Sequence, residues 1–515
     1  MSDKKQSDVK QPGWLCKVWL WVKRWWLPIA ILLITSTGLA CALSIPQQVF
    51  ETPREPANDK SAPVLLAQSN LRLAFLYITG GAIAVVGLIE TFRKNNNEKL
   101  KNDQDKEKND REHLRQVRAD RRERYTKAVE QLGDEKAPIR MGGVYTLVGL
   151  VDEWLEDESI EKYEDRLKEG QVIVNNLCAY IRSPFTLASH YNELSEDAPS
   201  LEGIYKDKKE EFYVDKAILD SEADVRLSII KEIHDRIQDP DKNTPGAWSD
   251  FEYDFSGSTF FYPIDLTKSY YKKPVNFSGA TYQGGANFSA SSYKGWANFS
   301  DSSYKGGARF YHSSYKDGAN FSRSTYMEKA DFSDSIYQDE VYFHSSTYKG
   351  EADFTGSIYK SGANFSRSTY NDVADFSGSI FYQKVYFGAD GDNSSFSRFT
   401  DCAPQFYDET NHKNTLFGSP NNDFTVENGR VYPIYRNLEG LPLGCKFLTS
   451  EQKEYPEYKF QEIDETENKL REVKDDEEKA NLIETLLSFY YNIWNWHWEA
   501  TTVKVEGTAP EEKNN

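Results

Sequence analysis

Residues 286–307 read ANFSASSYKGW followed by ANFSDSSYKGG, and this pair of 11-residue units decides the fold of the centre of the chain. From Phe255 to Phe387 an aromatic residue recurs every 11 positions, with Leu266 as the single exception. A second aromatic follows five residues after the first, so each unit divides into five plus six residues. A repeat of this length cannot bury its own apolar face and must stack on its neighbours, which predicts a solenoid.

Small residues accompany both aromatic rows. A small or β-branched residue, such as Ala286 or Val341, stands two positions before the first aromatic, and Ser stands two before the second in nearly every unit. Alternate residues of a strand face the same side, so each unit sends one small and one large side chain inward. A buried phenol needs a hydrogen-bond partner, and we expect the Ser row to supply it. The predicted solenoid core rows are Phe277, Phe288, Phe299, Phe310, Phe321, Phe332, Phe343, Phe354, Phe365 and Phe376, with Tyr282, Tyr293, Tyr304, Tyr315, Tyr326, Tyr337, Tyr348, Tyr359 and Tyr370.

The units at 286–290, 330–334 and 352–356 read Ala-(Asn/Asp)-Phe-x-x. In this motif, and in an apolar hairpin and helical segment before it, the chain resembles membrane-anchored bacterial proteins of the pentapeptide repeat family over roughly residues 20 to 390. The resemblance implies a right-handed quadrilateral β-helix with four units per coil, and it implies no common chemistry. Because the half-coil here has one residue more than two pentapeptides, we expect coils of about 22 residues, about six of them, over residues 250–400.

Two apolar runs near the N-terminus predict a transmembrane hairpin over residues 25–92, with spans at about 25–45 and 71–89. The first run is uncharged and has about the ~20 residues that a helix needs to cross ~30 Å of hydrocarbon. Glycines in the second run would permit close contact between the helices. These glycines are Gly80, Gly81 and Gly87.

Basic residues cluster before the first span and after the second, whereas the connecting loop holds only Arg54 and Lys60 before Arg72. The positive-inside rule then predicts a multi-pass protein of the bacterial inner membrane with both termini and the solenoid in the cytoplasm. The alternative is a cleaved secretory or lipoprotein signal ending at Cys41. The long segment before the first run, and the second run itself, favour the hairpin.

The rest of the chain divides by composition into further segments, so the predicted fold class is multidomain. Residues 1–24 are predicted to form a cytoplasmic N-terminal segment, and residues 93–124 are charged with both signs mixed, which predicts a helical stalk. Residues 125–240 carry apolar residues at three- and four-residue steps, which predicts a small all-α, helical-repeat-like domain. Residues 401–515 are predicted to form a C-terminal loop and an acidic helix with an aromatic tail.

The aromatic tail carries Trp494, Trp496 and Trp498 at alternate positions. These residues are candidates for contact with a partner or with the membrane surface, where Trp is favoured. The alternative is that this helix packs back and caps the open edge of the solenoid. Asp390-Gly-Asp392 hints at calcium, but it lacks the Glu of a calcium loop and is interpreted as a polar turn.

Charge and motifs exclude several function classes. The 62 Lys and Arg against 81 Asp and Glu give a net charge of -19, which argues against a general nucleic-acid binder. The five Cys are scattered, and the seven His form no HExxH pair. No GxSxG, Walker loop or GxGxxG stands between a strand and a helix. We therefore expect no catalysis, no cofactor and no metal.

The hypothesis that remains is a membrane-tethered scaffold that presents a solenoid surface to an unknown protein partner. Its other expected partners are the lipid bilayer, through two helices, and possible further copies of the chain. The alternative is a DNA mimic acting on a topoisomerase, as gyrase-binding members of the resembled family do. Residues 250–398 hold 17 acidic and 14 basic residues, a near-neutral balance that ranks this alternative second.

Overall fold

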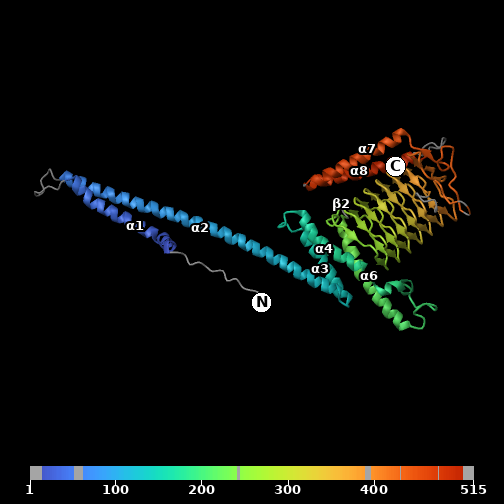
Figure 1. Cartoon of the computed structure of the whole chain (residues 1–515), viewed down its shortest axis with the longest axis horizontal. Helices are drawn as coiled ribbons and strands as arrows, with labels where there is room; N and C mark the ends of the chain where they lie inside the picture. The colour runs from blue at the N-terminus through green and yellow to red at the C-terminus, as the bar shows by residue number, and fades with distance from the viewer. Residues whose placement is uncertain are drawn as a thin grey trace, which may run out of the picture. The chain divides into compact units, whose positions relative to one another are not determined.

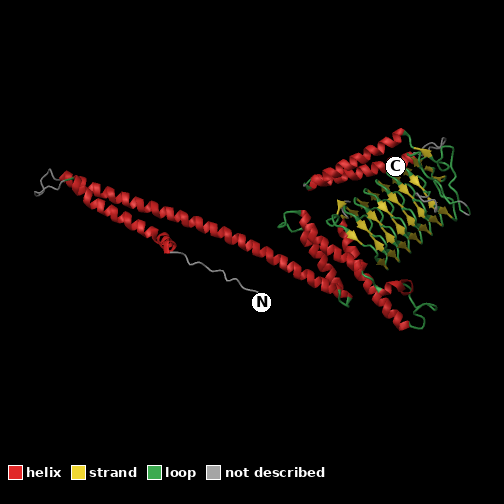
Figure 2. Cartoon of the chain, viewed as in Figure 1, coloured by secondary structure: helices red, strands yellow, loops and turns green. Residues whose placement is uncertain are grey.

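A computed structural model describes residues 14–50, 62–239, 244–388, 396–427, 429, 431–473 and 475–502. The chain has apolar N-terminal helices, a helical domain, a central β-solenoid of about six coils and C-terminal helices, so the predicted fold class is confirmed (Figure 2). The chain divides into two compact units, Met1–Asp120 and Arg121–Asn515.

The first unit contains α1 (Trp14–Val49) and the larger part of α2 (Ala62–Leu132), which lie side by side in Figure 1. Both are long and apolar enough to cross a membrane, by length and composition alone. The tight contact between them lies at Gly38, where an added Cβ would stand 2.1 Å from Thr79 Oγ1. An added Cβ at each of the three glycines of the second run would meet nothing within 4 Å, so the predicted role of those glycines is wrong.

The helix α2 is continuous from the second apolar run through the charged segment to Leu132. Its last turns belong to the helical domain. The helices of this domain bury the apolar residues that recur at three- and four-residue steps, as predicted. Val144, Leu147, Val148 and Val151 are buried on one side of the next helix. The other helices of this domain are α3 (Ala137–Leu155), α4 (Tyr163–Arg182), η1 (Thr186–His190), α5 (Tyr191–Leu194) and α6 (Lys209–Ile237).

Four parallel sheets form the sides of the solenoid, and in the regular coils each strand pairs with the strand 22 residues later, as Ser292 does with Ser314. The last pairings have longer steps, since Thr369 pairs with Arg398 and Ile380 with Leu416. Each side is named here after its outward residues. The Asn face comprises β3 (Tyr253–Asp254), β7 (Val275–Asn276), β11 (Ala297–Asn298), β15 (Ala319–Asn320), β19 (Val341–Tyr342), β23 (Ala363–Asn364) and β27 (Val385–Tyr386). The Thr face comprises β4 (Thr259–Phe260), β8 (Thr281–Tyr282), β12 (Ser303–Tyr304), β16 (Thr325–Tyr326), β20 (Thr347–Tyr348), β24 (Thr369–Tyr370) and β28 (Arg398–Phe399).

The remaining two sides follow the Thr face along each coil. The Asp face comprises β5 (Ile264–Asp265), β9 (Ala286–Asn287), β13 (Ala308–Arg309), β17 (Ala330–Asp331), β21 (Ala352–Asp353) and β25 (Ala374–Asp375). The Ile face comprises β6 (Tyr270–Tyr271), β10 (Ser292–Tyr293), β14 (Ser314–Tyr315), β18 (Ile336–Tyr337), β22 (Ile358–Tyr359), β26 (Ile380–Phe381), β31 (Leu416–Phe417) and β32 (Lys446–Phe447). Two small antiparallel pairs lie outside these faces: β1 (Gln238–Asp239) with β2 (Thr244–Pro245), and β29 (Tyr407–Asp408) with β30 (Lys413–Asn414).

Stacked aromatic rings fill the interior. Phe321 lies between Phe299 and Phe343 of the coils before and after it, with ring centroids 5.2 and 5.1 Å away. It also meets Phe310 and Phe332 edge-on, at 5.0 and 5.1 Å. Both arrangements are favourable for aromatic pairs, so one fully buried ring contributes stacking in two directions beyond its buried area.

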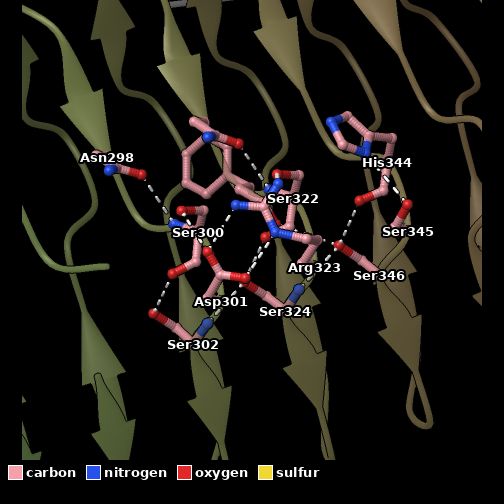
Figure 3. A network of polar contacts seen from close by, with 12 residues as sticks. Asn298, Ser300, Asp301, Ser302, Ser322, Arg323, Ser324, His344, Ser345 and Ser346 are labelled. Carbon is pink, nitrogen blue, oxygen red and sulfur yellow. Dashed lines mark hydrogen bonds and ion pairs between the residues drawn. The ribbon is translucent and has the colours of Figure 1, made fainter. Parts of the chain in front are cut away.

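Serine hydroxyls join the turns of successive coils (Figure 3). Ser324 Oγ accepts a hydrogen bond from the backbone N–H of Ser302 at 3.1 Å and donates to the carbonyl of Phe299 at 3.2 Å. The same bonds recur one coil later between Ser346 and the turn that begins at Phe321. Each Ser of the row from Ser291 to Ser379 therefore bonds to the turn of the coil before it and stabilises that turn.

The turn residue between the Phe and this Ser adopts positive φ, 58° at Asp301 and 57° at Arg323. An L-residue pays a small cost in this region. At this pair the two side chains also meet, since Arg323 Nε and Nη2 donate to the Asp301 carboxylate at 2.6 and 2.7 Å (Figure 3). The ion pair is exposed, so its contribution to stability is small.

Both ends of the solenoid are covered by the chain itself. At the N-terminal end, Phe185 of the helical domain stacks on Phe261, and one continuous apolar core joins the two parts. At the other end the aromatic columns continue beyond residue 400 through Phe406, Phe417 and Phe424, which are buried. The spacing of these last rings is irregular, and they close the stack where the 11-residue pattern stops.

Candidate functional site on the outer faces of the solenoid

The predicted core rows lie where the pattern places them. All the Phe and Tyr residues of these rows are buried, with at most 1% of their surface exposed. The Tyr rings project from the Thr face and the Ile face, which are opposite sides of the coil, and stack at 4.6 to 5.1 Å along each column. These residues therefore build the interior and are unavailable to a partner.

The prediction that the Ser row supplies hydrogen-bond partners to the Tyr row is wrong. The Ser hydroxyls bond to backbone groups instead, and within the described residues the hydroxyls of the Tyr rows are buried without a hydrogen-bond partner. Burial raises the pKa of Tyr326, and the nearby Ser324 hydroxyl opposes this rise. The Ser hydroxyl donates its single proton to the turn carbonyl, so it has none to donate to the phenol oxygen.

Replacing Tyr326 by Phe is expected to raise the free energy of unfolding by about 1 kcal/mol, because the change removes a buried hydroxyl that has no partner. The triple variant Y304F/Y326F/Y348F, whose three changes lie in one column, should show a larger increase in the free energy of unfolding. Denaturant unfolding of the purified chain measures the effect. A loss of stability in the triple variant would show that these hydroxyls are hydrogen-bonded.

Three of the faces present polar outward residues. The outward strand residues of the Thr face carry hydroxyls from Thr259 to Thr369 and end at the charged Arg398, and the Asn face shows mainly amides. Some outward amides already form a hydrogen bond within their own turn. Asn298 Oδ1, for example, accepts a hydrogen bond from the backbone N–H of Ser300 at 3.2 Å (Figure 3). These two faces offer regular, nearly uncharged rows of hydrogen-bonding groups.

The Asp face is more highly charged but mixed in sign. Burial raises the pKa of Asp375, and the neighbouring Asp353 adds to the rise. Arg309 interrupts the row of carboxylates, and Lys329 pairs with Glu351 at 2.8 Å and with Asp353 at 3.2 Å. Among the described residues no group of three or more His, Cys, Asp or Glu is arranged to hold a metal ion. The calcium-like Asp390-Gly-Asp392 lies outside the described residues.

The fourth side, the Ile face, is covered by a hairpin of α7 (Ser450–Glu472) and α8 (Asp476–Thr501) (Figure 1). Ile336 and Ile358 pack against Phe460 and Ile463 of α7 and against Ile493 of α8. The outward residue changes from Ser to Ile at residue 336, and this change in the repeat decides which side the hairpin covers.

Buried ion pairs fix the position of the hairpin. Glu467 is 7% exposed and bonds to both Lys294 and Lys316, and Asp464 lies 2.9 Å from Lys316. Burial opposes ionisation of Glu467, but the two lysines hold its pKa below the usual range. Lys294 Nζ also donates to Tyr490 Oη of α8 at 3.2 Å. The solenoid and both helices therefore share one polar network.

The three Trp residues of the tail have different surroundings. Trp494 is half-buried, with its ring 6.0 Å from that of His312. Trp496 stacks on Tyr455 of α7 at 5.9 Å. Trp498 remains 64% exposed, with the ammonium of Lys413 over its ring. The helix packs back onto the solenoid, as the alternative predicts, but it lies along the Ile face, while residues 396–427 and 431–448 close the open end. The part of the alternative that places α8 over this end is wrong.

His497 holds the end of α8 to the solenoid, because its Nε2 lies 2.7 Å from the carbonyl of Gly378. Burial lowers the pKa of His497 to about 4, and Lys413 adds to the decrease. A carbonyl only accepts, so the neutral ring donates from Nε2. The sequence offered no signal for this contact, since His497 belongs to no motif.

Acidification is expected to weaken this contact. The unfolded His497 binds a proton below about pH 6.5 and the folded one only below about pH 4, so stability rises with pH between these values and is complete above them. The loss on acidification is on the order of 3 kcal/mol. Unfolding measured from pH 7 to pH 4 tests this, with His497→Gln as the control, because Gln keeps a donor but does not titrate. An equal pH dependence in both proteins would contradict the assignment.

The described fold defines the chain as a β-solenoid protein with apolar N-terminal helices. No protein-family model matches the chain, and no curated protein and no solved structure shows significant similarity to it.

Proposed function

We propose that the protein is a membrane-tethered scaffold of the pentapeptide-repeat type, without catalytic activity, that binds a protein partner through an open face of its solenoid. The observation that carries this proposal is the difference between the faces: the chain's own hairpin covers the Ile face, whereas polar ladders continue along the Thr, Asn and Asp faces. A rigid stack with both ends covered offers its sides for binding.

Site-specific photo-cross-linking in the host cell tests this proposal. A benzoylphenylalanine residue replaces Thr325, Asn320 or Asp331, one on each open face, and Ser292 under the hairpin serves as the control. The expected result is a cross-link to a second protein from one open face and only to the chain's own α8 from Ser292. The proposal fails if no open face yields an intermolecular product.

The alternative, a DNA mimic acting on a topoisomerase, needs a continuous acidic side. The Asp face is the only described side with several outward carboxylates, and Arg309 and the paired Lys329 interrupt it. This arrangement favours the scaffold. A topoisomerase recovered on the probe at Asp331, together with inhibition of that enzyme by the purified protein, would reverse the ranking.

The proposed location is the bacterial inner membrane, with both termini and the solenoid in the cytoplasm. Its support is the two apolar helices and the basic residues that flank them. A single cysteine at Asn58, in a chain whose own cysteines are replaced, should react with an impermeant maleimide on intact spheroplasts. A cysteine at Asn58 that reacts only after lysis would refute this topology.

A further inference from the structure

A partly open cavity of about 590 Å³ lies between the Ile face and the α7–α8 hairpin. It opens where the outward residues of the face are small: Ser292 and Ser314 stand in the column that carries Ile336, Ile358 and then Ile380 in later coils. A volume of this size is typical of a small-molecule site.

The two walls of the cavity differ in chemistry. The wall from the hairpin is apolar and includes Leu470, Ile483, Leu486 and Leu487. These side chains continue the apolar surface that packs on the Ile ladder, but the ladder ends beneath them. An apolar helix surface that faces a gap instead of a packed core is costly in water, so the cavity favours an apolar occupant.

The floor and the open end supply polar groups. Ser314 Oγ is buried and has no hydrogen-bond partner within the described residues. Lys294 is neutralised by Glu467. Lys268 lines the cavity, is exposed, and forms no ion pair with any described residue, so its positive charge is available to an anion. His312 is 3.9 Å from Asp334, which already balances its charge when it is protonated.

The cavity is elongated along the solenoid axis. Its floor extends from Tyr270 through Ser292 and Ser314 to Ile336, which are outward residues of four successive coils. Three steps of ~4.8 Å between strands give a length of roughly 14 Å. A single extended hydrocarbon chain has this shape.

We propose that this cavity binds a single-chain amphiphile with an anionic head group. The chain lies over the two serines against the leucines of α8, the Ser314 hydroxyl contacts the occupant, and the head group lies at Lys268. This assignment is independent of the partner proposed for the open faces, because the cavity lies on the covered face.

Photolabelling of the full-length protein in lipid nanodiscs tests the proposal, with a diazirine-bearing dodecanoate as the probe and peptide mass spectrometry as the readout. Labelling of the apolar segments 25–49 and 63–89 reports partition into the lipid and gives the internal reference. The expected result is labelling of α8 near Leu486 that excess unlabelled dodecanoate suppresses. Absence of label in α8, while the apolar segments are labelled, overturns the proposal.

The variant S292I/S314I fills the cavity with the residue that the same column carries at 336, and its Ile side chains extend the ladder under the hairpin. Labelling of α8 should fall by at least about tenfold, because the chain loses its apolar burial. The double variant should be at least as stable as the original protein. A loss of labelling without a loss of stability therefore reports the filled cavity and not misfolding. The matched control is Ser303→Ile, an outward position on the Thr face, which should leave labelling unchanged. Labelling that persists in the double variant refutes the site.

The variant Lys268→Asn tests the head group, since Asn tolerates the positive φ of 54° at this position. It should weaken labelling by dodecanoate by about two- to fivefold, the range of an exposed ion pair, and leave labelling by the corresponding diazirine alcohol unchanged. Equal effects on both probes would overturn the anionic assignment.

Discussion

Replacing Phe321 by Ala is expected to lower the free energy of unfolding by about 3–5 kcal/mol, because the ring is fully buried and in contact with aromatic rings on every side. The neighbouring rings belong to coils that backbone hydrogen bonds hold in register, so they cannot close the space. Phe299 and Phe343 each lose a stacking partner as well.

Denaturant unfolding of the purified chain measures this loss, and hydrogen exchange should locate it in the coils around residue 321. The control is Thr347→Ala, which removes an outward side chain of the Thr face and should change stability by less than about 0.5 kcal/mol. A loss below about 1 kcal/mol in F321A would mean that the stack repacks around the cavity.

Replacing Glu467 by Gln is expected to destabilise the docked hairpin by about 3–5 kcal/mol. The change leaves Lys294 buried between Tyr270 and Tyr490 without a negative charge beside it, and it also removes one partner of Lys316. The hairpin should then separate from the Ile face in a fraction of molecules. Faster hydrogen exchange in α7 and α8, with unchanged exchange in the interior strands, would show this.

Two further variants isolate the cause. Glu465→Gln removes an exposed carboxylate of the same helix and should have no measurable effect. The double variant E467L/K294L replaces the buried pair by apolar side chains and should recover most of the stability. If the double variant is as unstable as E467Q, the loss does not come from the unpaired lysine.

The period of the aromatic residues was enough to predict the solenoid, its 22-residue coil and the buried rows. These properties depend on side-chain alternation and stacking, which act locally and repeat. The covered face had a signal as well, because the residue before the second aromatic changes to Ile at positions 336, 358 and 380. This row identifies the side that requires a partner from elsewhere in the chain.

Contacts between distant segments could not be predicted in the same way. The partner of the Ser row depends on the exact turn geometry, and the contact of His497 with Gly378 depends on how α8 lies on the solenoid. The rings beyond residue 400 stack without a fixed spacing, so no period reveals them. The cavity exists only because two serines of the solenoid lie opposite leucines of α8.

The serine bonds between turns have a direction, since the hydroxyl always comes from the following coil. On the ribosome, a newly made coil therefore completes its own turn only when the next 22 residues have emerged, and assembly proceeds from the N-terminal end with a lag of one coil. The last coils have no regular successor, and there Ser397 and Thr415 from the closing segment donate to Phe365 and Phe376 at 2.8 and 2.7 Å. Nascent chains halted before residue 397 should remain sensitive to protease in their last coil, and full protection at that stage would contradict this order.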